Sequence, residues 1–389
     1  MLYYPSYIKS AAQLIEQYNG QEPLANYLKK QFAANKKYGS KDRKYVAALC
    51  YNFYRMGKNF TEMPLADKVL LATFLCGDFS RELIPILKTS WIDFLGKSSE
   101  IKAQKLGCNL DDVFPFKKEL SKGIDFELFA LSIFQQPKLF LRVRTGYRNE
   151  VSRKLKAEKI EYNFVTDDCI ALPNGTKIDE LLEVNKAVVV QDYSSQQTLN
   201  YIKENIENFK FPNCDVWDCC AASGGKSILC YDIILLRLKL TVSDIRFSIL
   251  QNLHKRFIRI GLEKYDYFIC NLQDKNSVFP KTKFTTIICD APCSGSGTWG
   301  RTPEQIYFFK KEQIEEYANT QKQIVSNVIP FVKDGGYFFY ITCSVFAAEN
   351  EKIVAFIKKE FHLKLLKMEL LKGYDKMADT MFVAVFKKV

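Results

Sequence analysis

Two cysteines follow strand-like apolar runs in the last third of the chain. Cys293 lies in the sequence DAPCSGSG at 290–297, directly after the run 284–289, and Cys343 follows the run 337–341. In an open α/β sheet, ligands and chemistry collect at the carboxyl ends of the strands. Two thiols, the carboxylate of Asp290 and a glycine-rich turn at that edge predict a nucleophilic site that could attack an electrophilic ring.

A loop of small residues follows another strand-like run at 215–218 and reads DCCAASGGKS at 218–227. Paired glycines allow a ligand to approach the backbone closely, and the helix that follows offers free N–H groups to a carboxylate or a phosphate. The end of the loop matches a Walker A motif, but that motif needs a glycine five residues before Gly225, where Cys220 stands. The loop therefore argues against a P-loop nucleotidase.

Three acids stand at the ends of successive strand-like runs. Asp244 ends the second run, 18 residues beyond Lys226 (244 − 226), Asp274 follows the third, and Asp290 ends the fourth. An acid at the end of the second strand commonly accepts hydrogen bonds from ribose hydroxyls. Three acids in register along one sheet edge favour an adenosine-containing ligand.

The elements that must position these residues alternate from about residue 205 onward. Short apolar runs separated by longer helical patterns predict an α/β class domain at 206–389, with a doubly wound, mostly parallel Rossmann-like sheet. The expected strands are 215–218, 240–242, 268–270, 284–289, 337–341 and 381–386, and the expected helices include 247–260 and 311–328.

Two other parts precede this domain. Residues 1–135 show apolar residues at helical spacing and predict an all-α domain, and residues 136–205 predict a small basic α+β module. In that module Arg142 and Arg144 share one face of an expected strand, and a basic helical stretch begins near Arg148. We interpret these arginines as contacts to an RNA backbone; the alternative is an ordinary solvated face.

Composition sets the class of protein. The chain has 389 residues, 47% hydrophobic and 26% charged, with a net charge of +12, which favours a polyanionic partner. No apolar run reaches the roughly 18 residues of a spanning helix, and the N-terminus does not resemble a secretory signal, so we expect a cytoplasmic chain without a membrane partner. The 12 cysteines are scattered without zinc-finger spacing, and adjacency should keep Cys219 and Cys220 from one ion, so no metal is expected.

Taken together, these motifs are similar to those of a known family. The cofactor loop D-x-C-A-A-P-G-G-K is matched at 218–226, with Ser223 in place of proline, and D-A-P-C-S-G-x-G is complete at 290–297. T-C-S followed by E-N-E and the segment Q-D-x-S-x-Q are also present, while Gly300 stands where an arginine is usual. The chain resembles the S-adenosyl-methionine-dependent RNA cytosine carbon-5 methyltransferases, in the RsmB (Fmu or Sun) branch, and its first domain is similar to the NusB-like domain of that branch.

The resemblance implies roles for these residues. It implies formation of 5-methylcytosine in RNA, most plausibly 16S ribosomal RNA, through a covalent bond between the nucleophile Cys343 and the base. Cys293 would assist, Asp290 would hydrogen-bond the ring, and Lys226 would support the site electrostatically. The cofactor S-adenosyl-methionine would be held by Cys220, Ala221, Ala222, Ser223, Gly224, Gly225, Lys226, Asp244, Asp274 and Asp290. RNA would be bound by Arg142, Arg144, Arg148 and Arg301.

Several alternatives stay open. The two cysteines could exchange roles, since DNA cytosine methyltransferases attack with a cysteine in a Pro-Cys element like Pro292-Cys293. The substrate could be transfer RNA, because the motifs do not separate the two RNAs. The chain could also be a non-catalytic RNA-binding assembly factor. We expect it to act as a monomer.

Overall fold

The computed structural model describes residues 4–35, 37–77, 80–209, 214–235 and 238–389. These residues form two compact units. The first unit comprises residues 1–120, 124–137 and 298–311, and the second comprises 121–123, 138–297 and 312–389. The division of the chain into three domains at 135/136 and 205/206 stays a prediction.

The first unit is helical, as the periodicity of its apolar residues predicts. Its segments are α1 (Tyr4–Gln17), α2 (Leu24–Ala34), α3 (Ser40–Arg55), α4 (Leu65–Cys76), α5 (Ser80–Leu87), η1 (Thr89–Phe94), α6 (Ser99–Leu106), α7 (Leu110–Val113), η2 (Lys117–Glu119), α8 (Phe126–Ser132) and α14 (Glu304–Phe308).

Arg55 and Gly300 of the first unit both lie against the segment 133–137. Arg55 is fully buried, and its Nη1 donates to the carbonyl oxygens of Ile133 and Gln135 at 2.8 and 3.1 Å. Arg55 therefore connects α3 to the segment that follows α8. At Gly300 a Cβ atom would lie 3.0 Å from Cγ of Pro137, so the long side chain that is usual at this position in the family would require Pro137 to move.

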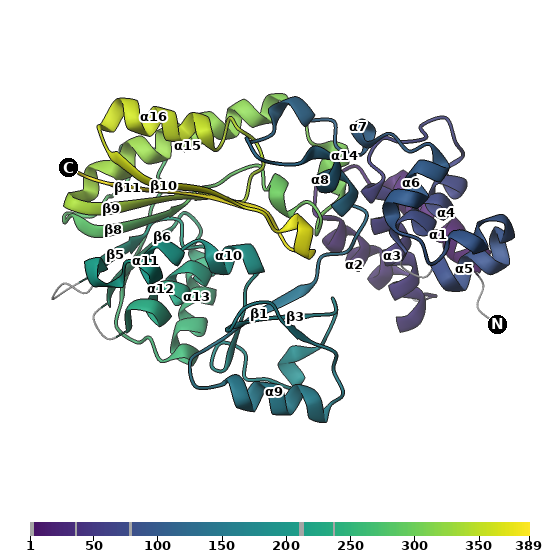
Figure 1. Cartoon of the computed structure of the whole chain (residues 1–389), viewed down its shortest axis with the longest axis horizontal. Helices are drawn as coiled ribbons and strands as arrows, with labels where there is room; N and C mark the ends of the chain where they lie inside the picture. Colours follow the sequence, from purple (N-terminus) through teal and green to yellow (C-terminus); the bar gives the residue numbers. More distant parts are fainter. Residues whose placement is uncertain (1–3, 36, 78–79, 210–213, 236–237) are drawn as a thin grey trace. The chain divides into compact units, whose positions relative to one another are not determined.

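The second unit contains a seven-stranded sheet in the order β10-β11-β9-β8-β5-β6-β7. The five strands from β9 to β7 run parallel, and β11 and β10 pair antiparallel at the other end. Helices α15 and α16 cover one face and α11, α12 and α13 cover the other (Figure 1). The elements are α10 (Tyr193–Gln197), α11 (Asn200–Glu204), η4 (Ile206–Phe209), β5 (Cys214–Asp218), α12 (Gly225–Ile234), β6 (Leu238–Asp244), α13 (Phe247–Ile260), β7 (Asp266–Ile269), β8 (Phe284–Asp290), η6 (Ser296–Thr298), α15 (Glu312–Val328), η7 (Ile329–Phe331), β9 (Val332–Thr342), α16 (Glu351–Phe361), β10 (Lys364–Leu371), η8 (Tyr374–Lys376) and β11 (Met381–Lys387).

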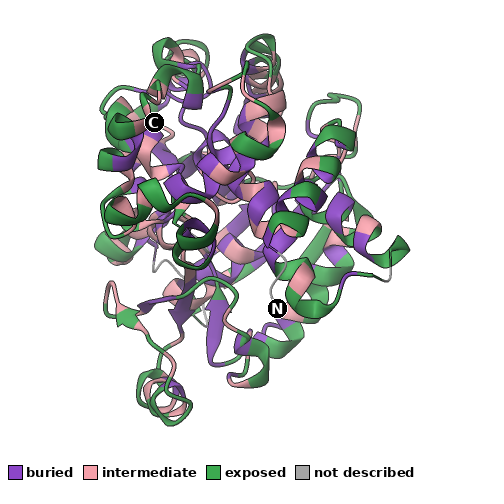
Figure 2. Cartoon of the chain, turned by 90° about the vertical axis from the view of Figure 1, so that its right-hand side faces the viewer, coloured by how far each residue is buried: buried purple, intermediate pink, exposed green. Residues whose placement is uncertain are grey.

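Position in the sheet explains the sequence of each strand. The inner strand β11 is buried from Met381 to Phe386, because helices cover both faces, whereas the edge strand β10 carries lysines and a glutamate and is mostly half-exposed. Helix α13 buries Leu250, Leu253, Phe257 and Ile260, an apolar stripe at the helical period, and ends at Gly261 in a left-handed conformation. Figure 2 shows this pattern, with buried residues along the strands and on the inward sides of helices.

A smaller antiparallel sheet of the second unit has the order β2-β3-β1-β4. It packs α9 against its own apolar core, which includes Leu141, Val151, Leu155 and Ile170. Its elements are β1 (Leu139–Val143), α9 (Arg148–Ala157), β2 (Asn163–Phe164), β3 (Cys169–Leu172), η3 (Ile178–Glu180) and β4 (Val188–Val190).

The predicted fold class is confirmed: a Rossmann-like α/β sheet, preceded by a helical part and a small α+β element. All six predicted strands of the large sheet are present, while β10 was not predicted. Within the described residues, no helix combines the length and the apolar composition needed to cross a membrane.

Candidate active site

The structure brings the two predicted cysteines together. Cys293 follows β8, Cys343 follows β9, and their Sγ atoms are 3.3 Å apart. Both residues are partly exposed. The hydrogen bond to Cys343, followed by burial, raises the pKa of Cys293 well above its usual range. Cys293 is therefore a protonated thiol at neutral pH, placed to donate a hydrogen bond to Cys343.

An ion pair lies at the same strand edge. Nζ of Lys226, in the first turn of α12, is 2.6 Å from Oδ2 of Asp290 at the end of β8. Burial is the largest single effect and would lower the pKa of Lys226, but the charge and the hydrogen bond of Asp290, together with the nearby Cys343 and Asp218, outweigh it and raise that pKa. The site thus holds a stable ammonium group beside a carboxylate that is only partly enclosed.

The carboxylate of Glu349 links the loop that carries Cys293 to the loop that carries Cys343. Its carboxylate accepts hydrogen bonds from the backbone N and Oγ of Ser294 at 2.9 and 2.5 Å, from Oγ of Ser344 at 2.6 Å and from Nε2 of Gln321 at 2.9 Å. Ser294 and Ser344 directly follow the two cysteines. Burial raises the pKa of Glu349, although the hydrogen bonds oppose that shift. One buried carboxyl therefore holds both loops in register.

Asn350 and Gly297 fix the same loops through the backbone. Nδ2 of Asn350 donates to the carbonyl oxygen of Ser344 at 2.9 Å, and its Oδ1 accepts from Oγ1 of Thr342 at 2.6 Å. The backbone N of Gly297 donates to the carbonyl oxygen of Cys343 at 2.8 Å. A Cβ at position 297 would lie 2.0 Å from the carbonyl oxygen of Thr380, so only glycine allows this approach.

The loop between β5 and α12 has the geometry of a ligand-binding turn. Gly224 and Ala222 both adopt left-handed conformations, with φ of +81° and +46°. At Gly224 a Cβ would come within 2.8 Å of the Phe257 ring. At Gly225, by contrast, a Cβ would meet no atom of the described residues within 4 Å. The turn therefore packs tightly against α13 on one side and leaves its backbone accessible on the other.

Two buried acids flank this loop. Asp244 at the end of β6 accepts hydrogen bonds from the backbone N of Ala222 at 3.1 Å and from Arg246. A carboxylate has about four acceptor sites, so capacity remains for hydroxyl groups of a ligand. Asp218 accepts a 2.5 Å bond from Oγ of Ser227, while its Oδ1 is buried without a hydrogen-bond partner in the described part of the chain. Burial raises the pKa of Asp218 to about 7.

Ser223, which replaces the proline usual in the family, is held by a residue that the sequence did not single out. Nη1 of Arg256, on α13, donates to the carbonyl oxygen of Ser223 at 2.6 Å and to its Oγ at 2.9 Å. Nε of Arg256 donates to Oδ1 of Asn185 at 3.0 Å. The serine thus gains a partner that proline could not offer, and Arg256 braces the loop from outside.

The other predicted cofactor residues lie along the same loop, with one exception. Cys220 and Ala221 precede the left-handed turn, and the backbone N of Ala221 donates to the carbonyl oxygen of Ser243 at 2.9 Å. Asp274 is exposed in a turn after β7, where its Oδ1 accepts a bond from the backbone N of Asn276. Among the hydrogen bonds of the described residues none joins Asp274 to the loop, so its role in cofactor binding stays a prediction.

The arginines predicted to bind RNA have different surroundings. The side chain of Arg142 is only 4% exposed. Its Nη1 is 2.6 Å from Oδ2 of Asp232 on α12, and its Nε donates to Gln191. Arg144 is paired with the same carboxylate at 2.8 Å. This differs from the interpretation of Arg142 as an RNA contact, because an enclosed and paired guanidinium cannot reach a phosphate without leaving its partners.

Arg148 and Arg301 lie nearer the surface. Arg148 has a half-exposed side chain, bonds to the carbonyl oxygen of Asp167 and lies 3.9 Å from the centre of the Phe164 ring. Arg301 lies in the first unit, before α14, and is partly exposed. For Arg144, Arg148 and Arg301, RNA binding stays a prediction.

The main positioning residues were not assigned from the sequence. Glu349 and Asn350 stand in the E-N-E triplet, which carried the resemblance without a role, so a signal was present. Arg256 had none, because its partner Ser223 is 33 positions away in sequence.

Comparison with known proteins shows what this chain is similar to. Residues 210–384 match the family model described as 16S rRNA methyltransferase RsmB/F. A probable ribosomal RNA small subunit methyltransferase B from Bacillus subtilis (strain 168) is 28% identical over 228 residues, which cover 57% of this chain and 50% of that protein. The ribosomal RNA small subunit methyltransferase B of Enterobacter sp. (strain 638) is 29% identical over 232 residues, covering 58% and 52%. The chain thus spans about half the length of the curated relatives it matches.

Solved structures share the fold. The crystal structure of PH0851 covers all of this chain and is itself fully covered, with a TM-score of 0.71 and 18% identity. The structure of NSun6 from Pyrococcus horikoshii with SFG covers 68% of this chain and 94% of its own, with a TM-score of 0.58 and 14% identity. The resemblance to the RsmB branch is confirmed over the part of the chain that the family model and the relatives cover.

Proposed function

With residues 210–384 matching the RsmB/F methyltransferases, we propose that this chain forms 5-methylcytosine in small-subunit ribosomal RNA with S-adenosyl-methionine as methyl donor. The observation that carries the proposal is the pair Cys293 and Cys343, whose Sγ atoms lie 3.3 Å apart at the ends of two adjacent parallel strands. Two thiols in contact at a partly open strand edge suit covalent chemistry better than they suit packing of a core.

The cofactor fits the loop after β5. The open backbone at Gly225, the first turn of α12 and the buried carboxylate of Asp244 supply N–H donors and an acceptor of the kinds that hold an adenosine ligand. When bound, S-adenosyl-methionine supplies an electrophilic methyl group. Arg256 and Asp244 hold the loop that binds it.

Cys343 is proposed as the nucleophile. Carbon 5 of cytosine is a poor nucleophile, but addition of the Cys343 thiolate to carbon 6 makes carbon 5 electron-rich, so that one difficult step becomes two easier ones. The thiol of Cys293 donates a hydrogen bond to Cys343 and supports its thiolate. After methylation the carbon 5 proton passes to solvent as the sulfur–carbon bond breaks, and Cys343 departs as a thiolate that the thiol of Cys293 stabilises by its hydrogen bond.

Asp290 and Lys226 act on the base. Asp290 is partly exposed and lies beside the cysteine loop, where it can hydrogen-bond the cytosine ring. Lys226, held 2.6 Å from it, offsets negative charge that develops on the ring when the thiolate adds. The target base must be unstacked to reach these groups.

Methyl transfer from labelled S-adenosyl-methionine tests the proposal directly. The full chain is incubated with unmodified small-subunit ribosomal RNA and, separately, with transfer RNA, and the nucleosides are analysed. We expect labelled 5-methylcytidine in the ribosomal RNA only. Label in transfer RNA alone would favour the alternative substrate, and labelling of another position or nucleoside would overturn the chemistry. No transfer, with RNA binding retained, would favour the assembly-factor alternative.

A further inference from the structure

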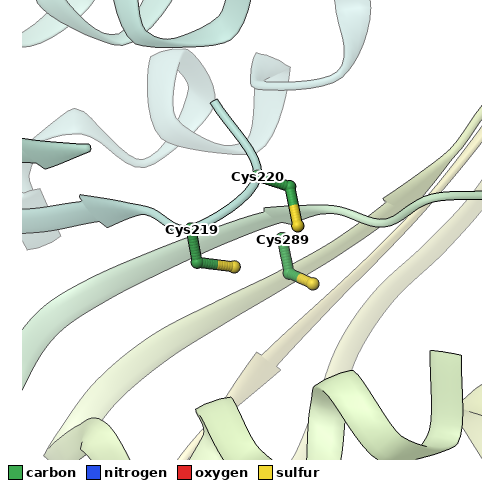
Figure 3. Close-up of side chains that lie close together, drawn as sticks. All are labelled: Cys219, Cys220 and Cys289. Carbon is green, nitrogen blue, oxygen red and sulfur yellow. The ribbon is translucent and has the colours of Figure 1, made fainter. Parts of the chain in front are cut away.

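Three other cysteines lie together beneath the loop. Cys219 and Cys220 follow β5, Cys289 lies in β8, and their sulfur atoms all lie within 4.8 Å of one another. In Figure 3 the side chain of Cys219 extends toward Cys289 from one side, and that of Cys220 extends toward it from above. This differs from the expectation that adjacency keeps Cys219 and Cys220 from one ion.

The backbone explains the convergence. The N–H of Cys219 donates to the carbonyl oxygen of Ile288 at 3.0 Å, which continues the pairing of β5 with β8 beyond its last register pair. The chain then turns upward at Cys220 toward the loop. One sulfur therefore arrives along the strand, one from the turn above it and one from the neighbouring strand.

The proposed methyl transfer gives Cys219 and Cys289 no task, and it involves Cys220 only as part of the cofactor loop. Cys219 and Cys289 are buried, with 1% and 0% exposure, while Cys220 is partly exposed. Hydrogen bonds from Cys219 and then Cys220 lower the pKa of Cys289 to about 6.

The ligand set selects the kind of ion. The cluster offers three sulfur atoms, and none of its members among the described residues is a histidine or a carboxylate. Thiolates favour soft ions such as Cu(I), whereas structural zinc sites have four ligands. Metal–sulfur bonds are about 2.3 Å long, so three sulfurs around one ion in a plane lie about 4 Å apart. That spacing agrees with the 4.8 Å bound.

We propose that Cys219, Cys220 and Cys289 form a three-thiolate site for a soft monovalent ion of the Cu(I) class. Binding forms three metal–sulfur bonds and releases the thiol protons to solvent, and no electron is transferred because the ion enters as Cu(I). Cys220 belongs to the proposed cofactor loop, so an ion there would restrain that loop. This last consequence rests on the proposed function, but the site itself does not.

The test uses the full chain carrying Cys293→Ser and Cys343→Ser, because that second thiol pair could also bind copper. Cu(I) is supplied without oxygen against a competing chelator, and binding is followed by the ultraviolet thiolate-to-metal absorption. Cys219→Ser, Cys220→Ser and Cys289→Ser are then added one at a time. Cys230→Ser, which changes a buried thiol of α12 outside the cluster, is the matched control.

We expect one Cu(I) per chain. Loss of any one of the three thiols should weaken binding at least about 10-fold, since changes even outside the ligand shell cost that much. Cys230→Ser should leave the affinity for Cu(I) unchanged. Thermal unfolding of the metal-free variants identifies any that fail to fold, in which case Cys→Ala at the same position replaces it. Failure of the background protein to compete with the chelator would overturn the proposal. So would Cu(I) binding by the three variants as tight as that of the background protein, or retention of Zn(II) in place of Cu(I). Because the background lacks both catalytic cysteines, none of these results depends on methyl transfer.

Discussion

Asp218 shows how burial changes a single residue. It ends β5 with 1% exposure, and burial raises its pKa from 3.8 to about 7. A carboxyl with a raised folded-state pKa contributes stability that is fully present below 3.8 and is lost as the pH rises through about 7. We therefore expect the free energy of unfolding to fall across this window, by on the order of a few kcal/mol.

Asp218→Asn should remove that fall, because an amide keeps the bond from Ser227 and does not ionise. Denaturant unfolding at several pH values measures it. Asp266→Asn, at an exposed residue where β7 begins, is the control and should keep the wild-type slope. Identical slopes for Asp218→Asn and the wild type would contradict the assignment.

Glu349 is a positioning residue, since it touches the serines beside both cysteines and not the reacting atoms. Glu349→Gln replaces an acceptor of four hydrogen bonds by an amide that must turn a donor toward one of them. Losing a buried partner of this kind costs about 1–3 kcal/mol, so we expect kcat to fall roughly 10- to 100-fold with cofactor affinity unchanged. Steady-state kinetics measures kcat, and calorimetry measures the affinity for S-adenosyl-methionine.

The control for that experiment is Glu360→Gln at the exposed end of α16, which should leave both quantities unchanged. Unchanged kcat for Glu349→Gln would show that the two loops hold their register without the carboxylate. A parallel loss of cofactor affinity would show a general structural defect.

At the scale of elements, α13 holds the proposed cofactor loop through Arg256. Arg256→Met removes the bonds to Ser223 while keeping the length of the side chain. Hydrogen bonds to a charged group contribute about 1.5–3 kcal/mol, so we expect S-adenosyl-methionine to bind roughly 10-fold more weakly or worse, as measured by calorimetry. Arg259→Met, one turn on and exposed, should bind the cofactor as the wild type does. Equal affinity in both variants would mean that the loop keeps its shape without α13.

Most helices and strands could be predicted from the sequence, because the spacing of apolar residues and the residue types at strand ends depend only on neighbouring residues in the chain. The runs before Cys293 and Cys343 became β8 and β9, and the helix 247–260 has the predicted bounds. Edge strand β10 was not predicted because Lys364, Lys367 and Glu369 interrupt its apolar residues without a regular period of two. The tertiary partners were not predictable: the bonds of Arg256 to Ser223 and of Arg142 to Asp232 join residues that no local pattern relates.

At the scale of the molecule, the small sheet and the large one form a single compact unit. Asp232 on α12 joins them, since it pairs with Arg142 and Arg144 of β1 and the residue after it, at 2.6 and 2.8 Å. Arg142 and Arg144 therefore connect two layers of the unit. Net charge of +12 still favours a polyanionic partner.

Asp232→Ala leaves Arg142 buried without its counter-ion. Breaking a buried pair by removing one partner costs about 3–5 kcal/mol, and we expect a loss near the lower end because the side chain of Arg144 is 15% exposed. Denaturant unfolding measures this loss. Asp167→Ala, whose carboxylate is fully exposed 3.9 Å from Arg148, should change stability little. Similar losses in both variants would show that Asp232 does not join the sheets.

The most direct test of the central claim is a search for a protein–RNA adduct that survives denaturation. Cys293→Ala and Cys343→Ala variants are each incubated with S-adenosyl-methionine and small-subunit ribosomal RNA. If Cys343 attacks the base and Cys293 assists release, the adduct accumulates only with Cys293→Ala. An adduct only with Cys343→Ala would reverse the two roles, and no adduct with either variant, with no methyl transfer by the wild type, would contradict covalent catalysis by this pair.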